Sequence, residues 1–374
     1  MTSWLWRLAW LLVPAAWAVH RWAPDQSVLA FSLACLSLMP LARAMGNATE
    51  ELAARLGAAA GSLLNSTFGN AAELIVGLAA LRGGRVELVK GSITGSILGN
   101  LLLVAGGSIL VGGLRRPRLR FSKVSAGASV SILFLAVVAL ATPAMLGHAS
   151  GKPQHGIAIS EAISVVLLVM YGLSLVFTLR TGELIAREAA EAAAVRPPLL
   201  ATPAEAAASL GTTDALRPQA RAGPVLPAVA RLLAAAAGTA VASEVLVAAL
   251  EGTLQALHLP EVFVGVVIVA IVGNAAEHST ALLFGWRGEM DVALGIAWES
   301  SKQIALLVAP VMVFAGALLG VPMDLAFSQL EVVAVALAVI ATALIALDGQ
   351  THWLEGAFLL AVYAVLAIGF WFGG

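Results

Sequence analysis

The sequence has few charged residues and almost no cysteine. Charged residues make up 11% of its 374 positions and hydrophobic residues 60%, whereas soluble proteins carry about 25% charged residues. So few charges cannot cover a chain of this length with a hydrated surface, and the mean hydropathy of +0.93 agrees. We therefore expect lipid to cover most of the protein.

Other absences exclude classes of function. The single cysteine, Cys35, rules out an internal disulfide and a metal site built from several cysteines. The net charge of −1 gives no reason to expect a nucleic-acid partner. The chain contains no His-Glu-x-x-His zinc motif, no nucleophile elbow and no phosphate-binding loop, which disfavours a membrane-embedded enzyme. We expect no resident cofactor.

Apolar stretches long enough to cross a bilayer, about 20 residues each, follow one another along the chain. They predict an all-α polytopic membrane protein with about eleven transmembrane helices. The second helix continues as an amphipathic stretch to about residue 57. The first is interpreted as a retained membrane helix, with a cleaved signal peptide or a helix lying at the membrane interface as the alternatives. The helices are expected near residues 4–20, 26–44, 61–81, 86–113, 122–142, 157–180, 226–254, 261–285, 290–318, 325–347 and 352–372.

The helices group into two halves around a polar segment. We assign an extra N-terminal helix to residues 1–22, a first five-helix repeat to residues 26–180 and a second five-helix repeat to residues 224–374. The Ala- and Pro-rich segment 181–223 mixes acidic residues with arginines, which is typical of a solvated connector. We expect this linker to be cytoplasmic and to be helical only before Pro197-Pro198.

Basic residues in short loops indicate the orientation of the chain, because such loops tend to stay in the cytoplasm. The linker lies two helices after the most basic short loop and so falls on the same side. Counting helices from that loop places the amino terminus in the cytoplasm and the carboxyl terminus outside. The loop contains Arg115, Arg116, Arg118, Arg120 and Lys123.

A polar pentapeptide occurs twice in the chain. Gly69-Asn70-Ala71-Ala72-Glu73 recurs as Gly273-Asn274-Ala275-Ala276-Glu277, at an offset of 204 residues (277 − 73). Apolar segments keep the same offset. With the helix count above, an odd number of crossings separates the two glutamates, so the copies run in opposite directions. Inverted repeats are typical of transporters, which bind substrate near the midplane where the halves meet.

The two glutamates are the strongest candidates for a chemical role. A carboxylate inside a membrane helix costs about 2.5 kcal/mol or more, yet Glu73 and Glu277 both lie in apolar stretches. Asn70 and Asn274 each lie three residues earlier and share a helix face with the glutamate. Carboxylate and amide oxygens suit Ca²⁺ or Mn²⁺. A purely structural role, with each glutamate holding helices together, is the alternative.

Supporting ligands are expected from the helix that follows each motif. Ser96 and Asn100 are four apart, and Ser300 and Gln303 are three apart, so each pair shares a face. Hydrogen bonds between helices are the alternative role of these residues. His278 follows Glu277 directly and suits either a proton relay or simple packing.

Both motifs resemble those of the calcium/proton exchanger (CAX) family of the calcium/cation antiporter superfamily, over roughly residues 26–372. The resemblance rests on residues 69–74 and 273–278, which end in Leu74 and His278. It implies that Glu73 and Glu277 bind Ca²⁺ when ionised and protons otherwise, so that the two fluxes are coupled. It extends to Asn47-Ala48-Thr49-Glu50-Glu51-Leu52, Gly95-Ser96-Ile97-Leu98, Gln303-Ile304-Ala305-Leu306, Val308-Ala309-Pro310 and Trp353-Leu354-Glu355-Gly356.

One departure from the family lies in the second repeat. The family usually has Gly at the position of Glu299 and a small or neutral residue at that of Lys302. The two residues are three apart and could pair. Our hypothesis is that Lys302 supplies a fixed positive charge beside the site and Glu299 a third carboxylate.

Several alternatives stay open. A Na⁺- or K⁺-coupled cation exchanger shares the superfamily, a passive channel would need no pH gradient, and a membrane-embedded metal-dependent enzyme is a remote alternative. The expected partners are Ca²⁺, H⁺ and the lipid bilayer; the sequence leaves a homo-oligomer open. The short loops favour a bacterial inner membrane, or a vacuole in a eukaryote.

Overall fold

The computed structural model describes residues 2–56, 61, 64, 67–150, 153–195 and 225–373, and these are almost entirely helical. Within these residues, eight helices are long and apolar enough to cross a membrane. Two further helices, Glu261–Gly273 and Ala275–Arg287, meet at a bend of 64° and count as a ninth crossing if the pair forms one span. A nearly all-helical membrane protein is thereby confirmed, while the count of eleven crossings and the inverted repeats stay predictions.

Most boundaries lie within a few residues of those expected. The helix expected at residues 157–180 continues into the linker as far as Val195, and residues 196–224 lie outside the described residues. The elements, with η for π-helical segments, are α1 (Thr2–Trp22), α2 (Ser27–Leu56), α4 (Ala71–Arg82), α5 (Val86–Leu98), η1 (Gly99–Val104), α6 (Ala105–Gly113), β1 (Leu119–Arg120), α7 (Lys123–Ser150), α8 (Pro153–Val195), α10 (Val225–Leu257), α11 (Glu261–Phe263), η2 (Val264–Val269), α12 (Ala270–Gly273), α13 (Ala275–Arg287), α14 (Met290–Gln303), η3 (Ile304–Val308), α15 (Ala309–Leu319), α16 (Gln329–Ala346), β2 (Gln350–Thr351) and α17 (Trp353–Gly373).

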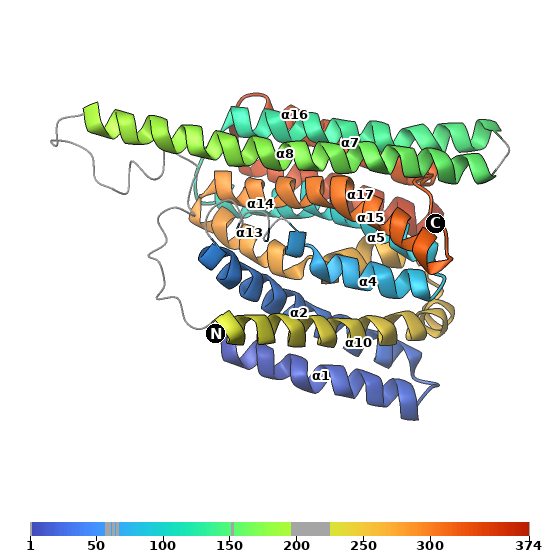
Figure 1. Cartoon of the computed structure of the whole chain (residues 1–374). Helices are drawn as coiled ribbons and strands as arrows, with labels where there is room; N and C mark the ends of the chain where they lie inside the picture. The colour runs from blue at the N-terminus through green and yellow to red at the C-terminus, as the bar shows by residue number, and fades with distance from the viewer. Residues whose placement is uncertain are drawn as a thin grey trace.

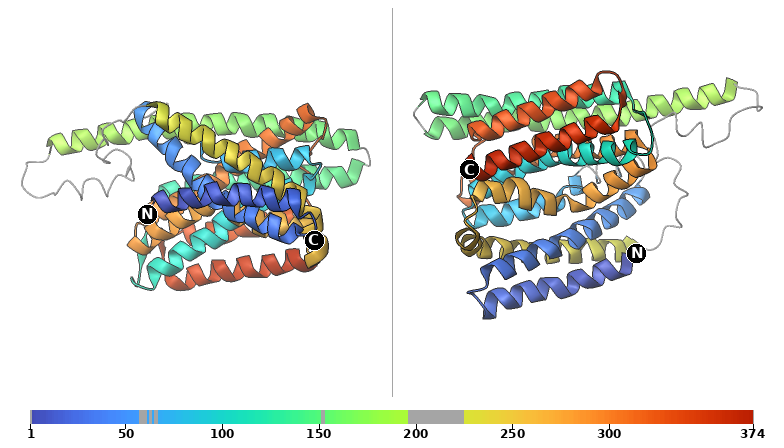
Figure 2. Two further views of the ribbon diagram at one scale, coloured as in Figure 1. Left: turned by 90° about the horizontal axis from the view of Figure 1, so that it is seen from below. Right: turned by 180° about the vertical axis from the view of Figure 1, so that it is seen from behind.

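The helices are arranged in layers that run roughly parallel to one another. Helices α7 and α8 form one side of the molecule and α1 and α10 the opposite side, with α4, α5, α13 and α14 between them (Figures 1 and 2). Helix α8 has 43 residues, about twice the number that a bilayer crossing needs. Its last part therefore projects beyond the other helices (Figure 1).

The 204-residue offset of the sequence recurs in the elements. Helices α4 and α13 both begin immediately after the asparagine of their motif. The next span in each half is an α-helix interrupted by a π-helical segment, α5–η1–α6 in the first and α14–η3–α15 in the second. Such π-helical segments are frequent at functional sites. From the motif asparagine to the end of the next span, the described residues of the two halves therefore follow the same order of local structures.

Glycines let α5 of the first half cross η2 of the second half at backbone contact. A Cβ added to Gly95 would lie 2.0 Å from the Val266 carbonyl oxygen, and one added to Gly265 would lie 3.0 Å from the Gly91 Cα. Close approach through small residues is the usual way in which membrane helices associate. The crossing brings the second motif, which follows η2, against α5.

Ion pairs and a short strand pair join the two halves at the two ends of the bundle. The Arg85 end, as we call it, comprises residues 83–85, 258–260 and 320–328. There Arg85 donates to Glu251 at 2.8 Å and to Glu261 at 3.3 Å. The Arg115 end comprises residues 114–122 and 347–352, where β1 pairs antiparallel with β2. The termini lie at opposite ends of the bundle (Figure 1).

The close crossing predicts a stability effect at Gly95. We expect Gly95→Ala to lower the melting temperature of the purified protein, because overpacking costs roughly 1–3 kcal/mol. Gly172→Ala is the matched control, since its added Cβ meets nothing within 4 Å on an exposed part of α8. There alanine favours the helix by about 1 kcal/mol. Equal melting temperatures for the two variants would contradict the backbone contact.

Candidate cation site

Each candidate glutamate lies in the first turn of a helix that begins at a break in the chain. Asn70 precedes α4 and Asn274 precedes α13, and both asparagines are buried. The 64° bend lies at Asn274. The first turn of a helix favours a negative charge, because the free backbone N–H groups carry partial positive charge. The Gly-Asn pair of the motif thus gives each glutamate a helix start inside the bundle.

The structure brings the two glutamates together. The Oε1 atom of Glu73 lies 3.7 Å from the position of a Cβ added to Gly273, in the second motif. Both glutamates are half-buried, and the Oε2 atom of each is fully buried. Two motifs 204 residues apart therefore form one site.

Three asparagines hold the site together with hydrogen bonds between the two halves. Asn70 donates to the Gln303 side chain at 2.5 Å. Asn274 donates to Ser96 at 2.9 Å, and Asn100 donates to Ser300 at 2.9 Å. All of the supporting residues expected from the following helices, apart from Glu299 and Lys302, are thus in this network. They do hydrogen-bond between helices, which was the alternative to ligation.

The same asparagines leave their oxygens free. Among the described residues, five buried side-chain oxygens of the two motifs and their neighbouring helices have no hydrogen-bond partner. A buried polar atom left unpaired costs about 1–3 kcal/mol, and native structures contain few such atoms. Five of them around the two motifs therefore suit a cation, which oxygen atoms can coordinate. They are Oδ1 of Asn70, Asn100 and Asn274 and Oε2 of Glu73 and Glu277.

The donor set fits a hard cation. Ca²⁺ takes 6–8 oxygen ligands, which include carboxylates and amide carbonyls. No group of three or more His, Cys, Asp and Glu side chains that could hold a metal occurs in the described part of the chain. The unpaired donor atoms are all oxygens, whereas thiophilic metals prefer sulfur ligands.

His278 lies beside the site rather than on the glutamate face. It is buried, and its Nε2 atom has no hydrogen-bond partner among the described residues. Its ring approaches Gly99, at the start of η1, with Cε1 3.9 Å from an added Cβ. Contact with the first half through η1 is compatible with both the proton relay and the packing role.

Glu299 and Lys302 pair with each other. The Lys302 ammonium lies 2.5 Å from the Glu299 carboxylate, and the side chains are 13% and 50% exposed respectively. The pair is net neutral, and half of the Glu299 side chain faces out of the protein. Their role in the cation site stays a prediction.

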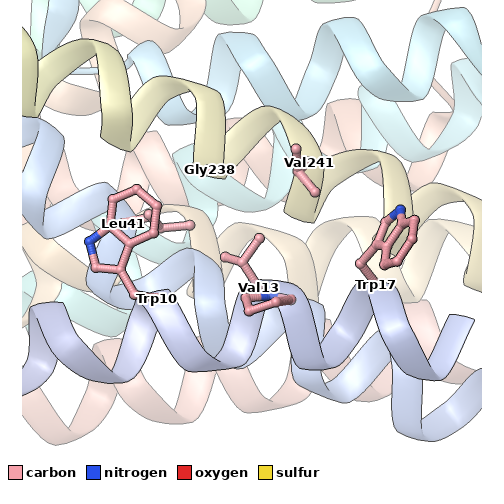
Figure 3. Close-up of a pocket in the computed structure, with 7 residues that line it drawn as sticks. Trp10, Val13, Trp17, Leu41, Gly238 and Val241 are labelled. Carbon is pink, nitrogen blue, oxygen red and sulfur yellow. The ribbon is translucent and has the colours of Figure 1, made fainter.

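The space next to the glutamates is small. A cavity of about 10 Å³ lies beside Glu73, close to the smallest volume that one water needs. A larger pocket, of about 400 Å³, lies elsewhere, between α1, α2 and α10, and has an apolar lining that suits lipid rather than a cation. Figure 3 shows Trp10 and Trp17 of α1 facing Gly238 and Val241 of α10 across this pocket.

Comparison with known proteins identifies the family. The profile described as sodium/calcium exchanger protein matches residues 26–180 and 227–372. The chain belongs to this family. It is therefore a membrane transporter and not an enzyme. The profile covers the two halves and leaves out the first helix and much of the linker.

Relatives of this exchanger match its sequence or structure over almost the whole chain. The Ca²⁺/H⁺ antiporter of Synechocystis sp. is 40% identical over 361 residues, 96% of this chain and 95% of the relative. The Ca²⁺/H⁺ antiporter ChaA of Bacillus subtilis is 39% identical over 92% of both chains. The solved structure of native YfkE is 34% identical, with a TM-score of 0.79 over 98% of this chain and 99% of YfkE. The resemblance to calcium/proton exchangers is thus confirmed.

One buried positively charged side chain, in the first half of the exchanger, was not predicted from the sequence. Lys90 of α5 is 7% exposed and donates to Asp324 at 2.6 Å and to the Ala326 carbonyl at 2.9 Å. The signal was present, because a lysine inside an apolar span is costly and needs a partner. The partner lies 234 residues later, and the repeat does not indicate it.

The Glu299–Lys302 pair predicts a charge effect on binding. Lys302→Ala leaves a lone carboxylate, so we expect a two- to fivefold higher apparent Ca²⁺ affinity and half-maximal activity at higher pH, about the effect of one partly exposed charge. The Glu299→Gln/Lys302→Ala double variant restores neutrality and is the control. Affinity and pH profile are measured by uptake into vesicles. An unchanged Lys302→Ala variant would contradict a role for Lys302 in the site.

Proposed function

We propose that this protein is a secondary active antiporter that exchanges Ca²⁺ for H⁺ through Glu73 and Glu277. The observation that carries the proposal is the set of five buried, unpaired oxygens, four from the two motifs and one from Asn100 of η1. The relatives named as Ca²⁺/H⁺ antiporters, at 40% and 39% identity, support it. Ca²⁺ is then the transported substrate and not a resident cofactor.

The site couples the fluxes by mutual exclusion. Two carboxylates are neutralised by one Ca²⁺ or by two protons, and both use the same oxygens. A charged site is costly to move through a low-dielectric region, so only the neutralised forms cross readily. The asparagine oxygens would complete the shell around Ca²⁺, while their amide nitrogens stay bonded to the opposite half. The expected stoichiometry is two protons for each Ca²⁺.

Transport follows alternating access around a fixed site in this proposal. The two five-helix halves are inverted repeats whose glutamates meet near the midplane of the bilayer. Eleven crossings place the termini on opposite sides, which agrees with their positions at opposite ends of the bundle. The Arg115 end and the amino terminus would be cytoplasmic, by the distribution of basic residues. The membrane is then a bacterial inner membrane.

The family match favours one second candidate. Members of the family are described as sodium/calcium exchangers, so Na⁺ or K⁺ rather than H⁺ is the alternative counter-ion. Mn²⁺ is the alternative substrate, because it accepts the same oxygen ligands. These candidates share the site and differ only in the ions that neutralise it.

The test is Ca²⁺ uptake into liposomes with an acidic interior. We expect uptake that collapses with a protonophore and falls to background in Glu73→Gln and in Glu277→Gln, because either change removes one of the two charges that balance Ca²⁺. Glu161→Gln is the matched control, since Glu161 is half-buried in α8 and contributes no atom to the site. It should transport like the wild type.

The outcomes separate the candidates. Proton-coupled Ca²⁺ uptake that survives in both glutamine variants would refute the mechanism. Uptake driven by a Na⁺ or K⁺ gradient and unaffected by the protonophore would move the protein to the second candidate. Ca²⁺ movement down its own gradient without any counter-ion would indicate a channel.

A further inference from the structure

The small cavity beside Glu73 points toward one end of the bundle. Its walls come from α4, α5 and the η3–α15 span, and on each wall the lining residues step away from the glutamate toward the Arg85 end. Helix α4 ends at Arg82, α5 starts at Val86 and α15 ends at Leu319, all next to that end. The lining residues are Glu73 and Gly77, then Ser96, Ile93, Ser92 and Val89, then Ile304, Val308 and Met312.

Met312 closes this cavity against α4. A Cβ added to Gly77 would lie 2.8 Å from the Met312 sulfur and 3.3 Å from its methyl carbon. Gly77 lies one helical turn beyond Glu73, and Met312 is fully buried. Because Gly77 has no side chain, the Met312 side chain occupies the space that a larger residue at position 77 would fill. The contact joins the first half of the chain to the second.

The helices around this contact are also fixed at the Arg85 end. Lys90, next to the lining residue Val89, is bound to Asp324 of the loop after α15. Thr94, on the same helix, donates to the buried Glu331 at the start of α16 at 3.0 Å. Arg85 joins the turn between α4 and α5 to Glu251 and Glu261. The Arg85 end is therefore held closed by polar contacts above an apolar constriction.

We propose that Met312, packed on Gly77, is the gate that closes the ion pathway between Glu73 and the Arg85 end, and that Ser92 lines this pathway. The proposal rests on the proposed transport function and adds the route by which the ion leaves the site on this side. A dry apolar constriction stops a hydrated cation without any charge. Methionine suits the role, because it has three rotatable side-chain bonds and can move without a backbone shift.

The test is the reactivity of a cysteine at position 92. Cys35 is buried and is the only cysteine, so Cys35→Ala with Ser92→Cys gives a single thiol in the pathway. The probe is a charged, membrane-impermeant methanethiosulfonate, applied to vesicles of either orientation. Asp25→Cys, near Ser27 and Gly252, marks the Arg85 end and Arg118→Cys marks the Arg115 end, since both positions are exposed.

The gate predicts faster labelling when the methionine is shortened. A closed transporter populates minor open states at about 0.1–10%, and the labelling rate follows the fraction of molecules in which the thiol is accessible. Met312→Ala removes the side chain that closes the pathway, so we expect it to raise the labelling rate of the position-92 thiol from the Arg85 end about tenfold or more. Gly77→Ala should act in the same direction, because its methyl group displaces the Met312 sulfur. Met312→Leu conserves the side-chain volume and should label like the parent.

Met290→Ala is the matched control, because Met290 is equally buried but lies at the start of α14, outside the pathway. The proposal is overturned if Met312→Ala and Gly77→Ala both label at the parental rate. It is also overturned if Met290→Ala accelerates labelling as much, or if the thiol reacts only from the Arg115 end. Labelling needs no transported ion, so this result is independent of whether Ca²⁺/H⁺ exchange itself is found.

Discussion

The structure depends on the cost of placing two carboxylates next to each other inside a membrane protein. Each charge is expensive away from water, and their repulsion adds to that cost. Stability therefore requires that something neutralise them. The two lysines of the spans that follow the motifs are already paired, Lys90 with Asp324 and Lys302 with Glu299. In the proposed function, an ion from outside the protein neutralises the two carboxylates.

The backbone around the carboxylates is shaped by the same constraint. A straight helix has no free N–H group in its middle, so a glutamate there would lack donors. Breaking the chain at Asn274 creates a helix start within the bundle, and the π-helical segment η1 of the first half lies against the helix that starts there. Glycines such as Gly95 then let the helices approach until the asparagine amides reach the opposite half. Local irregularity and close packing therefore belong together.

Much of this was predictable, because it is local. Apolar runs gave the helices, and the repeated pentapeptide identified Asn70, Glu73, Asn274 and Glu277. Other features were not predictable, because they depend on contacts between segments far apart in sequence. The partner of Lys90 lies in a loop beyond α15, and the apposition of Met312 and Gly77 follows from the angle between two helices. Nothing in the spacing of either residue indicates these contacts.

Hydropathy, helix length and the cost of a buried carboxylate act along the chain, so the lipid environment, the helices and the residue types of the site follow from local sequence. Which atoms stay unpaired depends instead on how the two halves pack. The asparagine nitrogens are taken by the opposite half and their oxygens are not. That choice depends on which helix lies across from each amide, and it emerges only when the two halves pack together.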